Sequence, residues 1–208
     1  MIETEQHARD YIATLADGAA IARLERFAEL LLAENQHQNL ISKPSEAQLW
    51  QRHFADSAQL LAHVPRGTLE DSGSEPWLDL GTGAGLPGLV IAILIPDFPV
   101  RLVESRARRI EFLQKCVNAL NLGRCEVLGD RLERIDPFPA SVISARAFAP
   151  FDKLLRLSAP FSTKRTRYLL PKGRSAAHEL NQQKRAIRAM FHVEQSLTDR
   201  EAGIIVSA

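Results

Sequence analysis

A glycine-rich stretch between a short apolar run and a helical pattern constrains this chain more than any other feature. It covers residues 78–88, in the order Leu-Asp-Leu-Gly-Thr-Gly-Ala-Gly-Leu-Pro-Gly. Glycine lacks a Cβ, so the backbone there can turn tightly and approach a ligand closely. Pro87 suits the first turn of a helix, where its missing N–H costs nothing. The stretch therefore predicts a strand, a ligand-binding turn and a helix in direct succession.

Apolar runs alternate with helical patterns through the rest of the chain. Runs at 77–80, 100–103, 125–128, 141–144 and 168–170 are separated by loops and by helical patterns, among them those near 86–95 and 106–121. Such alternation predicts an α/β, Rossmann-like fold, in which helices cover both faces of a mostly parallel sheet and ligands bind beyond the carboxyl ends of the strands. Two further runs, 191–193 and 204–206, predict an antiparallel hairpin at one edge, which makes seven strands.

The first 65 residues have a different pattern. Apolar residues recur at helical spacing around 21–31 and 47–61, and Ser45 is expected to cap the second of these helices. Turn-forming residues fill positions 65–76 and predict a linker. We therefore expect a helical extension at 1–65 and an α/β domain at 76–208, which together form one compact unit.

Composition narrows the class of protein. A net charge of +1 and a pI of about 7.9 do not indicate a nucleic-acid binder, so any basic surface must be local, as in clusters at 106–109 and 164–174. These clusters are more often solvated faces than binding sites. Without a long apolar stretch, a secretion signal or a disulfide framework, the chain is expected to be cytoplasmic with no membrane partner. The histidines lack metal-ligand spacing, so no metal is expected.

Two classes of cofactor fit the glycine loop. Residues 83–88 match the G-x-G-x-x-G pattern of dinucleotide-binding enzymes, whereas Asp79 ahead of Gly81-Thr-Gly83 resembles the first motif of Rossmann-like methyltransferases. Glu104, after the second run, can accept hydrogen bonds from ribose hydroxyls in either class. The chain has no room for the separate substrate domain of a dehydrogenase. This favours S-adenosylmethionine.

Residues after the fourth predicted strand narrow the choice of the atom that accepts the methyl group. The Asn-Pro-Pro-Tyr-like segment of adenine-amine methyltransferases and the cysteine nucleophile of cytosine-C5 enzymes are both absent from residues 144–150. Guanine N7 carries an exposed lone pair, so its methylation needs orientation and electrostatics rather than a general base. The sequence is consistent with N7 chemistry. A small-molecule methyltransferase and a non-catalytic, cofactor-binding RNA chaperone remain alternatives.

Six separated segments together resemble the bacterial 16S rRNA guanine-N7 methyltransferases of the RsmG or GidB family. Besides the glycine loop, they are residues 39–40, 52–57, 129–133, 144–150 and 170–173. The resemblance implies transfer of a methyl group from S-adenosylmethionine to N7 of a guanine in a hairpin loop of 16S rRNA, the 530 loop. The implied partner is 16S rRNA or the small ribosomal subunit, and no obligate protein partner is expected.

The resemblance also implies roles for individual residues. The expected cofactor contacts are Asp79, Gly81, Gly83, Gly85 and Leu86 at the methionine end, Glu104 at the ribose, Leu132 and Glu133 at the adenine, and Arg146 beside the methyl group. Arg146 and Lys172 are the expected catalytic residues. The expected RNA contacts are Arg131, Phe148, Lys172 and His53.

Four of these residues also have a plain structural interpretation. Arg146 could be a structural ion-pair partner, and Lys172 an ordinary surface lysine. His53 could stabilise its own helix by pairing with Asp56, and Phe148 could pack in the core.

Overall fold

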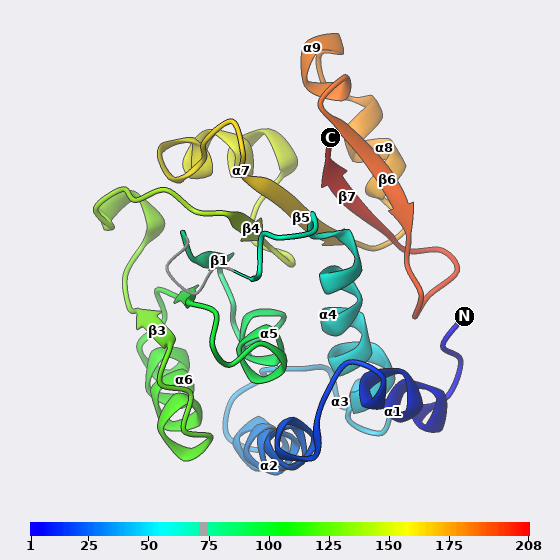
Figure 1. Ribbon diagram of the computed structural model, residues 1–208, viewed down its shortest axis with the longest axis vertical. Helices are drawn as coiled ribbons and strands as arrows, with labels where there is room; N and C mark the ends of the chain where they lie inside the picture. Colours follow the sequence, from blue (N-terminus) through cyan, green and yellow to red (C-terminus); the bar gives the residue numbers. More distant parts are fainter. Residues whose placement is uncertain (71–74) are drawn as a thin grey trace.

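A twisted seven-stranded sheet runs through the part of the chain that the computed structural model describes, residues 1–70 and 75–208 (Figure 1). The strand order is β3-β2-β1-β4-β5-β7-β6. Pairs among β1 to β5 are parallel, and β7 is antiparallel to both β5 and β6. The strands are β1 Trp77–Leu80, β2 Val100–Val103, β3 Cys125–Leu128, β4 Val142–Ser144, β5 Arg167–Lys172, β6 Phe191–Gln195 and β7 Gly203–Ser207. The predicted fold class and edge hairpin are confirmed.

Helices cover both faces of the sheet because successive strand residues alternate between two hydrophobic cores. Leu102 belongs to one core and Val103 to the other, and Ile204 and Ile205 divide in the same way. The helical elements after β1 are α5 Gly88–Leu94, α6 Ala107–Ala119, η3 Leu132–Arg134, α7 Phe151–Ser158, η4 Ala159–Phe161, α8 Ala176–Asn181 and α9 Arg185–Arg188. Every residue of α5 is buried, which explains why its sequence is apolar on all sides.

The N-terminal segment is helical, as expected. Its elements are α1 Glu5–Ala13, α2 Gly18–Asn35, α3 Lys43–Glu46, η1 Trp50–Ala55, α4 Asp56–Ala58 and η2 Gln59–His63. Leu24 and Phe27 of α2 share one hydrophobic core with Leu89 and Ile91 of α5, so α2 packs on α5, which in turn packs on β1 and β2. The predicted linker falls partly on residues 71–74, outside the described residues, and the division into two parts stays a prediction.

One local expectation for this segment is confirmed in outline and another is wrong. The predicted helix near 47–61 is present, but its winding is irregular, because η1 is a π-helix and η2 a 3₁₀-helix. The backbone N–H groups of Trp50 and Gln51 donate to the carboxylate of Glu5, at 3.0 and 2.8 Å, so contact with α1 shapes the first turn. Ser45 is not a cap: it lies within α3, and its hydroxyl donates to the carbonyl of Ser42.

Candidate functional site

The glycine loop leaves β1 in a backbone conformation that few other residues adopt. Gly81, Gly83 and Gly85 have φ values of +63°, +60° and +84°, in the left-handed region. A Cβ on Gly81 would lie 2.6 Å from Cδ2 of Phe148, so this glycine also allows a close approach between the loop and the segment after β4. The predicted turn is therefore present, and its backbone faces that segment.

Asp79 holds this loop from inside the sheet. Its side chain is buried; Oδ2 accepts the N–H of Gly88 at 3.0 Å, and Oδ1 accepts the hydroxyl of Ser144 at 2.6 Å. Burial raises the pKa of Asp79 to about 6, against the opposing effect of these hydrogen bonds. Asp79 thus ties β1, β4 and the start of α5 together. Its expected contact with a cofactor ammonium group stays a prediction.

A cavity of about 390 Å³ lies beside the loop, at the carboxyl ends of β1 and β2. Its walls include the predicted residues Gly81, Glu104, Arg131, Leu132, Glu133 and Phe148. The carboxylate of Glu104 accepts the N–H groups of Ser105, Arg106 and Gly83, at 2.7, 2.9 and 3.2 Å. These contacts fix the orientation of Glu104. Among the described residues, five other expected cofactor contacts do not line this cavity: Asp79, Gly83, Gly85, Leu86 and Arg146.

A larger cleft of about 820 Å³ lies where α3, η1, the carboxyl ends of β4 and β5, and the β6–β7 turn meet. It brings together His53, Arg146 and Lys172, which are far apart in the sequence. Ala147 lines both cavities and has a φ of +56°, an uncommon conformation for a residue with a Cβ. The two cavities therefore meet just beyond β4. Phe148 and Arg131 lie in the smaller one, apart from the expected RNA contacts His53 and Lys172.

Arg146 is the central charge of the larger cleft. Its Nη1 lies 3.2 Å from Nδ1 of His53 and 3.8 Å from Oδ2 of Asp56, and 27% of its side chain is exposed. Burial lowers the pKa of His53 to about 3, and Arg146 adds to this effect, so the ring is neutral at pH 7. We infer that Nδ1 accepts from Arg146 and that Nε2, 2.9 Å from the hydroxyl of Ser45, carries the proton. His53 and Asp56 thus both contact Arg146.

Lys172 is no ordinary surface lysine. Its side chain is only 10% exposed, and Nζ lies 2.8 Å from Oε2 of Glu179 in α8. Arg52, also in the cleft wall, pairs with Asp199 at 2.9 Å. The cations of the cleft are therefore held by neighbouring carboxylates. Among the described residues, no group of three or more His, Cys, Asp and Glu side chains is arranged to hold a metal ion.

Comparison with known proteins identifies the family. The family model described as rRNA small subunit methyltransferase G matches residues 20–203. This chain belongs to that family. It is 54% identical over 206 residues to the Ribosomal RNA small subunit methyltransferase G of Erythrobacter litoralis, an alignment that covers 99% of this chain and 97% of the relative. The protein of that name from Novosphingobium aromaticivorans is 54% identical over 190 residues, with 91% and 81% covered.

Membership in the rRNA small subunit methyltransferase G family confirms the predicted family and enzyme class, an S-adenosylmethionine-dependent methyltransferase. The solved structure of Aeropyrum pernix fibrillarin, in complex with natively bound S-adenosyl-L-methionine, has a TM-score of 0.51 and 13% sequence identity. That comparison covers 76% of this chain and 75% of fibrillarin, and shows a shared fold. No helix among the described residues is long and apolar enough to cross a bilayer.

Sequence reasoning missed part of the cleft wall of this methyltransferase. Ser196, Thr198 and Asp199 belong to the turn between β6 and β7, and Thr198 donates to Asp56 at 2.7 Å. Polar turn residues show no periodicity and match no motif, so the sequence carried no signal for them. Ala147 was missed as a separate site residue because its left-handed backbone depends on its surroundings.

Proposed function

We propose that this methyltransferase transfers the methyl group of S-adenosylmethionine to N7 of a guanine in the 530 loop of 16S rRNA. The family supports a small-subunit rRNA acceptor. The structural observation that carries the proposal is Ala147, which lines both the smaller cavity and the larger cleft. A donor in one and an acceptor base in the other would meet at this residue. A ribosomal acceptor also agrees with the expected cytoplasmic location.

The residues of the smaller cavity fit the nucleoside part of this cofactor. Three backbone N–H groups fix the carboxylate of Glu104, which keeps the capacity to accept a hydrogen bond from a ribose hydroxyl. Leu132 is buried in the wall and offers an apolar surface to a base. The left-handed conformations of the loop glycines turn the backbone beside this cavity, where the methionine end would bind. When bound, the cofactor supplies an electrophilic methyl group on a sulfonium sulfur.

The larger cleft fits chemistry that needs no general base. Both ring nitrogens of His53 are engaged, and the carboxylate of Asp56 accepts from Thr198 and Gln59 and lies close to Arg146. Guanine N7 has a free lone pair, so no proton must leave before it reacts. The residues of the cleft therefore act by orientation and electrostatics. In this proposal Arg146 and Lys172 contact the acceptor RNA and its phosphates.

The decisive experiment maps N7-methylguanosine in 16S rRNA from cells with and without this protein, by borohydride reduction and aniline cleavage. We expect one signal in the 530 loop to vanish without the protein and to return with the wild-type chain. Gly83→Asp should fail to restore it, because an L-residue at φ +60° is strained and its Cβ would lie 3.3 Å from Arg109.

Gly123→Asp is the matched control, because a Cβ at that position has nothing within 4 Å, and it should restore the signal fully. An unchanged methylation pattern without the protein would contradict the rRNA acceptor and favour a small molecule. A signal that persists in Arg146→Ala cells, when Gly83→Asp abolishes it, would contradict the role given to Arg146.

A further inference from the structure

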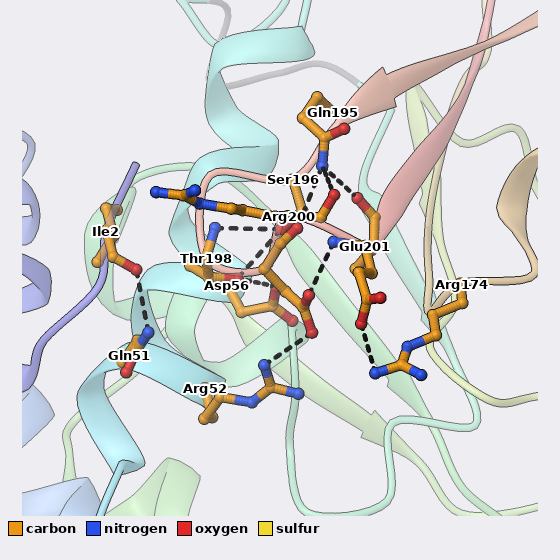
Figure 2. Close-up of polar contacts among 12 residues, drawn as sticks. Ile2, Gln51, Arg52, Asp56, Arg174, Gln195, Ser196, Thr198, Arg200 and Glu201 are labelled. Atoms are coloured by element: carbon orange, nitrogen blue, oxygen red, sulfur yellow. Dashed lines mark hydrogen bonds and ion pairs between the residues drawn. The ribbon is translucent and has the colours of Figure 1, made fainter.

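The turn between β6 and β7 reaches across the larger cleft to the helical segment that carries Asp56. Figure 2 shows Arg52, Asp56 and Thr198 where that segment and the turn meet. The hydroxyl of Thr198 donates to Oδ1 of Asp56 at 2.7 Å, and the side-chain amide of Gln59 donates to the same oxygen at 2.9 Å. The other carboxylate oxygen of Asp56 is the one that faces Arg146. The carboxylate of Asp56 therefore links Thr198 to Arg146.

Thr198 is itself held in place. It is 5% exposed, and its N–H donates to the hydroxyl of Ser196 at 3.2 Å. The N–H of Leu197 donates to Oε1 of Gln59 at 2.7 Å, and the carbonyl of Leu197 accepts the N–H of Ile2, also at 2.7 Å. The hydroxyl of Thr198 thus meets Asp56 from a fixed direction.

A carboxylate held on one oxygen has less freedom to rotate about its last side-chain bond. If Thr198 lost its hydroxyl, Asp56 would keep Gln59 as a donor but could turn within its pocket, and its second oxygen would move relative to Arg146. Burial already disfavours the charged form of Asp56, so each donor to its carboxylate matters more than it would in water. His53 would still contact Arg146 from the other side. Loss of the Thr198 hydroxyl should therefore loosen the guanidinium without releasing it.

We propose that Thr198 is a positioning residue, which orients Asp56 and thereby fixes the guanidinium of Arg146 in the larger cleft, next to Ala147. This inference rests on the proposed function, in which Arg146 contacts the acceptor RNA. It assigns the β6–β7 turn a part in methyl transfer, although the turn comes from the edge of the sheet.

The test compares Thr198→Val, which replaces the hydroxyl with a methyl group, with Thr198→Ser, which keeps the hydroxyl. Single-turnover methylation is measured on small ribosomal subunits from cells that lack the protein, and cofactor affinity is measured separately by calorimetry. We expect Thr198→Val to lower the single-turnover rate by about tenfold, the scale of one hydrogen bond to a charged group, with unchanged cofactor affinity. Thr198→Ser should recover the rate to within about twofold.

Thr166→Val is the matched control. Thr166 is similarly buried, and its hydroxyl donates to the carbonyl of Ala140 at 2.7 Å, next to the start of β5 and away from the cleft. Thr166→Val should lower the melting temperature much as Thr198→Val does, with no change in the single-turnover rate of methylation. An equal loss of rate in Thr166→Val would show that general destabilisation explains the effect, and would overturn the inference.

A double-variant cycle with Arg146→Lys tests whether Thr198 acts through Arg146. Arg146→Lys alone should slow methylation, and Thr198→Val should then add less than about twofold. A full tenfold effect in both backgrounds, or a wild-type rate in Thr198→Val alone, would overturn the inference and leave the proposed function intact. If wild type failed to methylate the subunits, or if Arg146→Lys had no effect, the proposed function or its use of Arg146 would fail instead.

Discussion

Two buried groups near the site, His53 and Asp79, should respond to pH in opposite directions. The folded-state pKa of His53 is about 3, below its ordinary value of about 6.5, so only the unfolded chain takes up this proton as the pH falls. Because of His53, the free energy of unfolding therefore decreases as the pH falls from 6.5 to 3. The pKa of Asp79 is raised to about 6, so the folded state takes up its proton first. Between about pH 6 and 4 the two effects oppose each other.

His53→Asn should unmask the contribution of Asp79. Relative to wild type, the free energy of unfolding of this variant should rise by about 1.4 kcal/mol per pH unit as the pH falls from 6 to 4. The free energy of unfolding of Asp79→Asn, relative to wild type, should instead fall by a similar amount per pH unit over the same range, whatever the absolute stability of this variant. Urea unfolding at half-unit pH steps measures both slopes. Parallel curves for wild type and His53→Asn would contradict a neutral His53 in the fold.

The sequence could name individual site residues but could not pair them. Glu104 and Leu132 line one cavity, and Arg146 and Lys172 line another. Their partners come from elements that no local pattern connects to them, such as Glu179 of α8 for Lys172. Phe148 shows the same limit: its aromatic ring suited either RNA or core, and its place beside Gly81 depends on how the glycine loop folds.

At the scale of elements, the contact between α5 and the sheet depends on Gly88. A Cβ there would lie 2.2 Å from Cδ2 of Leu102 and 2.8 Å from Oδ2 of Asp79. Gly88→Ala should therefore lower the free energy of unfolding by about 1–3 kcal/mol, the usual cost of overpacking. Gly123→Ala, in open space, should change it by less than about 0.5 kcal/mol. Equal stability of the two variants in urea unfolding would mean that α5 can move away at no cost.

Strands were easier to predict than the N-terminal helices, for a physical reason. A strand buried on both faces is apolar throughout, so its own residues reveal it. The π-helix at Trp50–Ala55 lies against α1, whose Glu5 accepts two of its N–H groups across 45 and 46 positions of sequence. Periodicity over a short window could predict a helix there but not its winding.

For the whole molecule, the number of phosphate contacts sets how strongly salt should affect RNA binding. Net charge is +1, and cleft cations such as Arg52 and Lys172 already pair with carboxylates. We expect about three phosphate contacts, which would weaken binding of a 530-loop hairpin by roughly tenfold or more between 50 and 200 mM salt. Fluorescence anisotropy titrations check this, with cofactor binding at the same salt concentrations as the control. Affinity for the hairpin that stays constant across this range would contradict an RNA acceptor.

The contact between Asp56 and Thr198 spans 142 positions of sequence, and Ile2 meets Leu197 beside it. While the chain is being translated, the glycine loop emerges long before the turn that completes the wall of the larger cleft. All residues that line the smaller cavity, which lie within 81–157, are therefore made before those that complete the larger cleft.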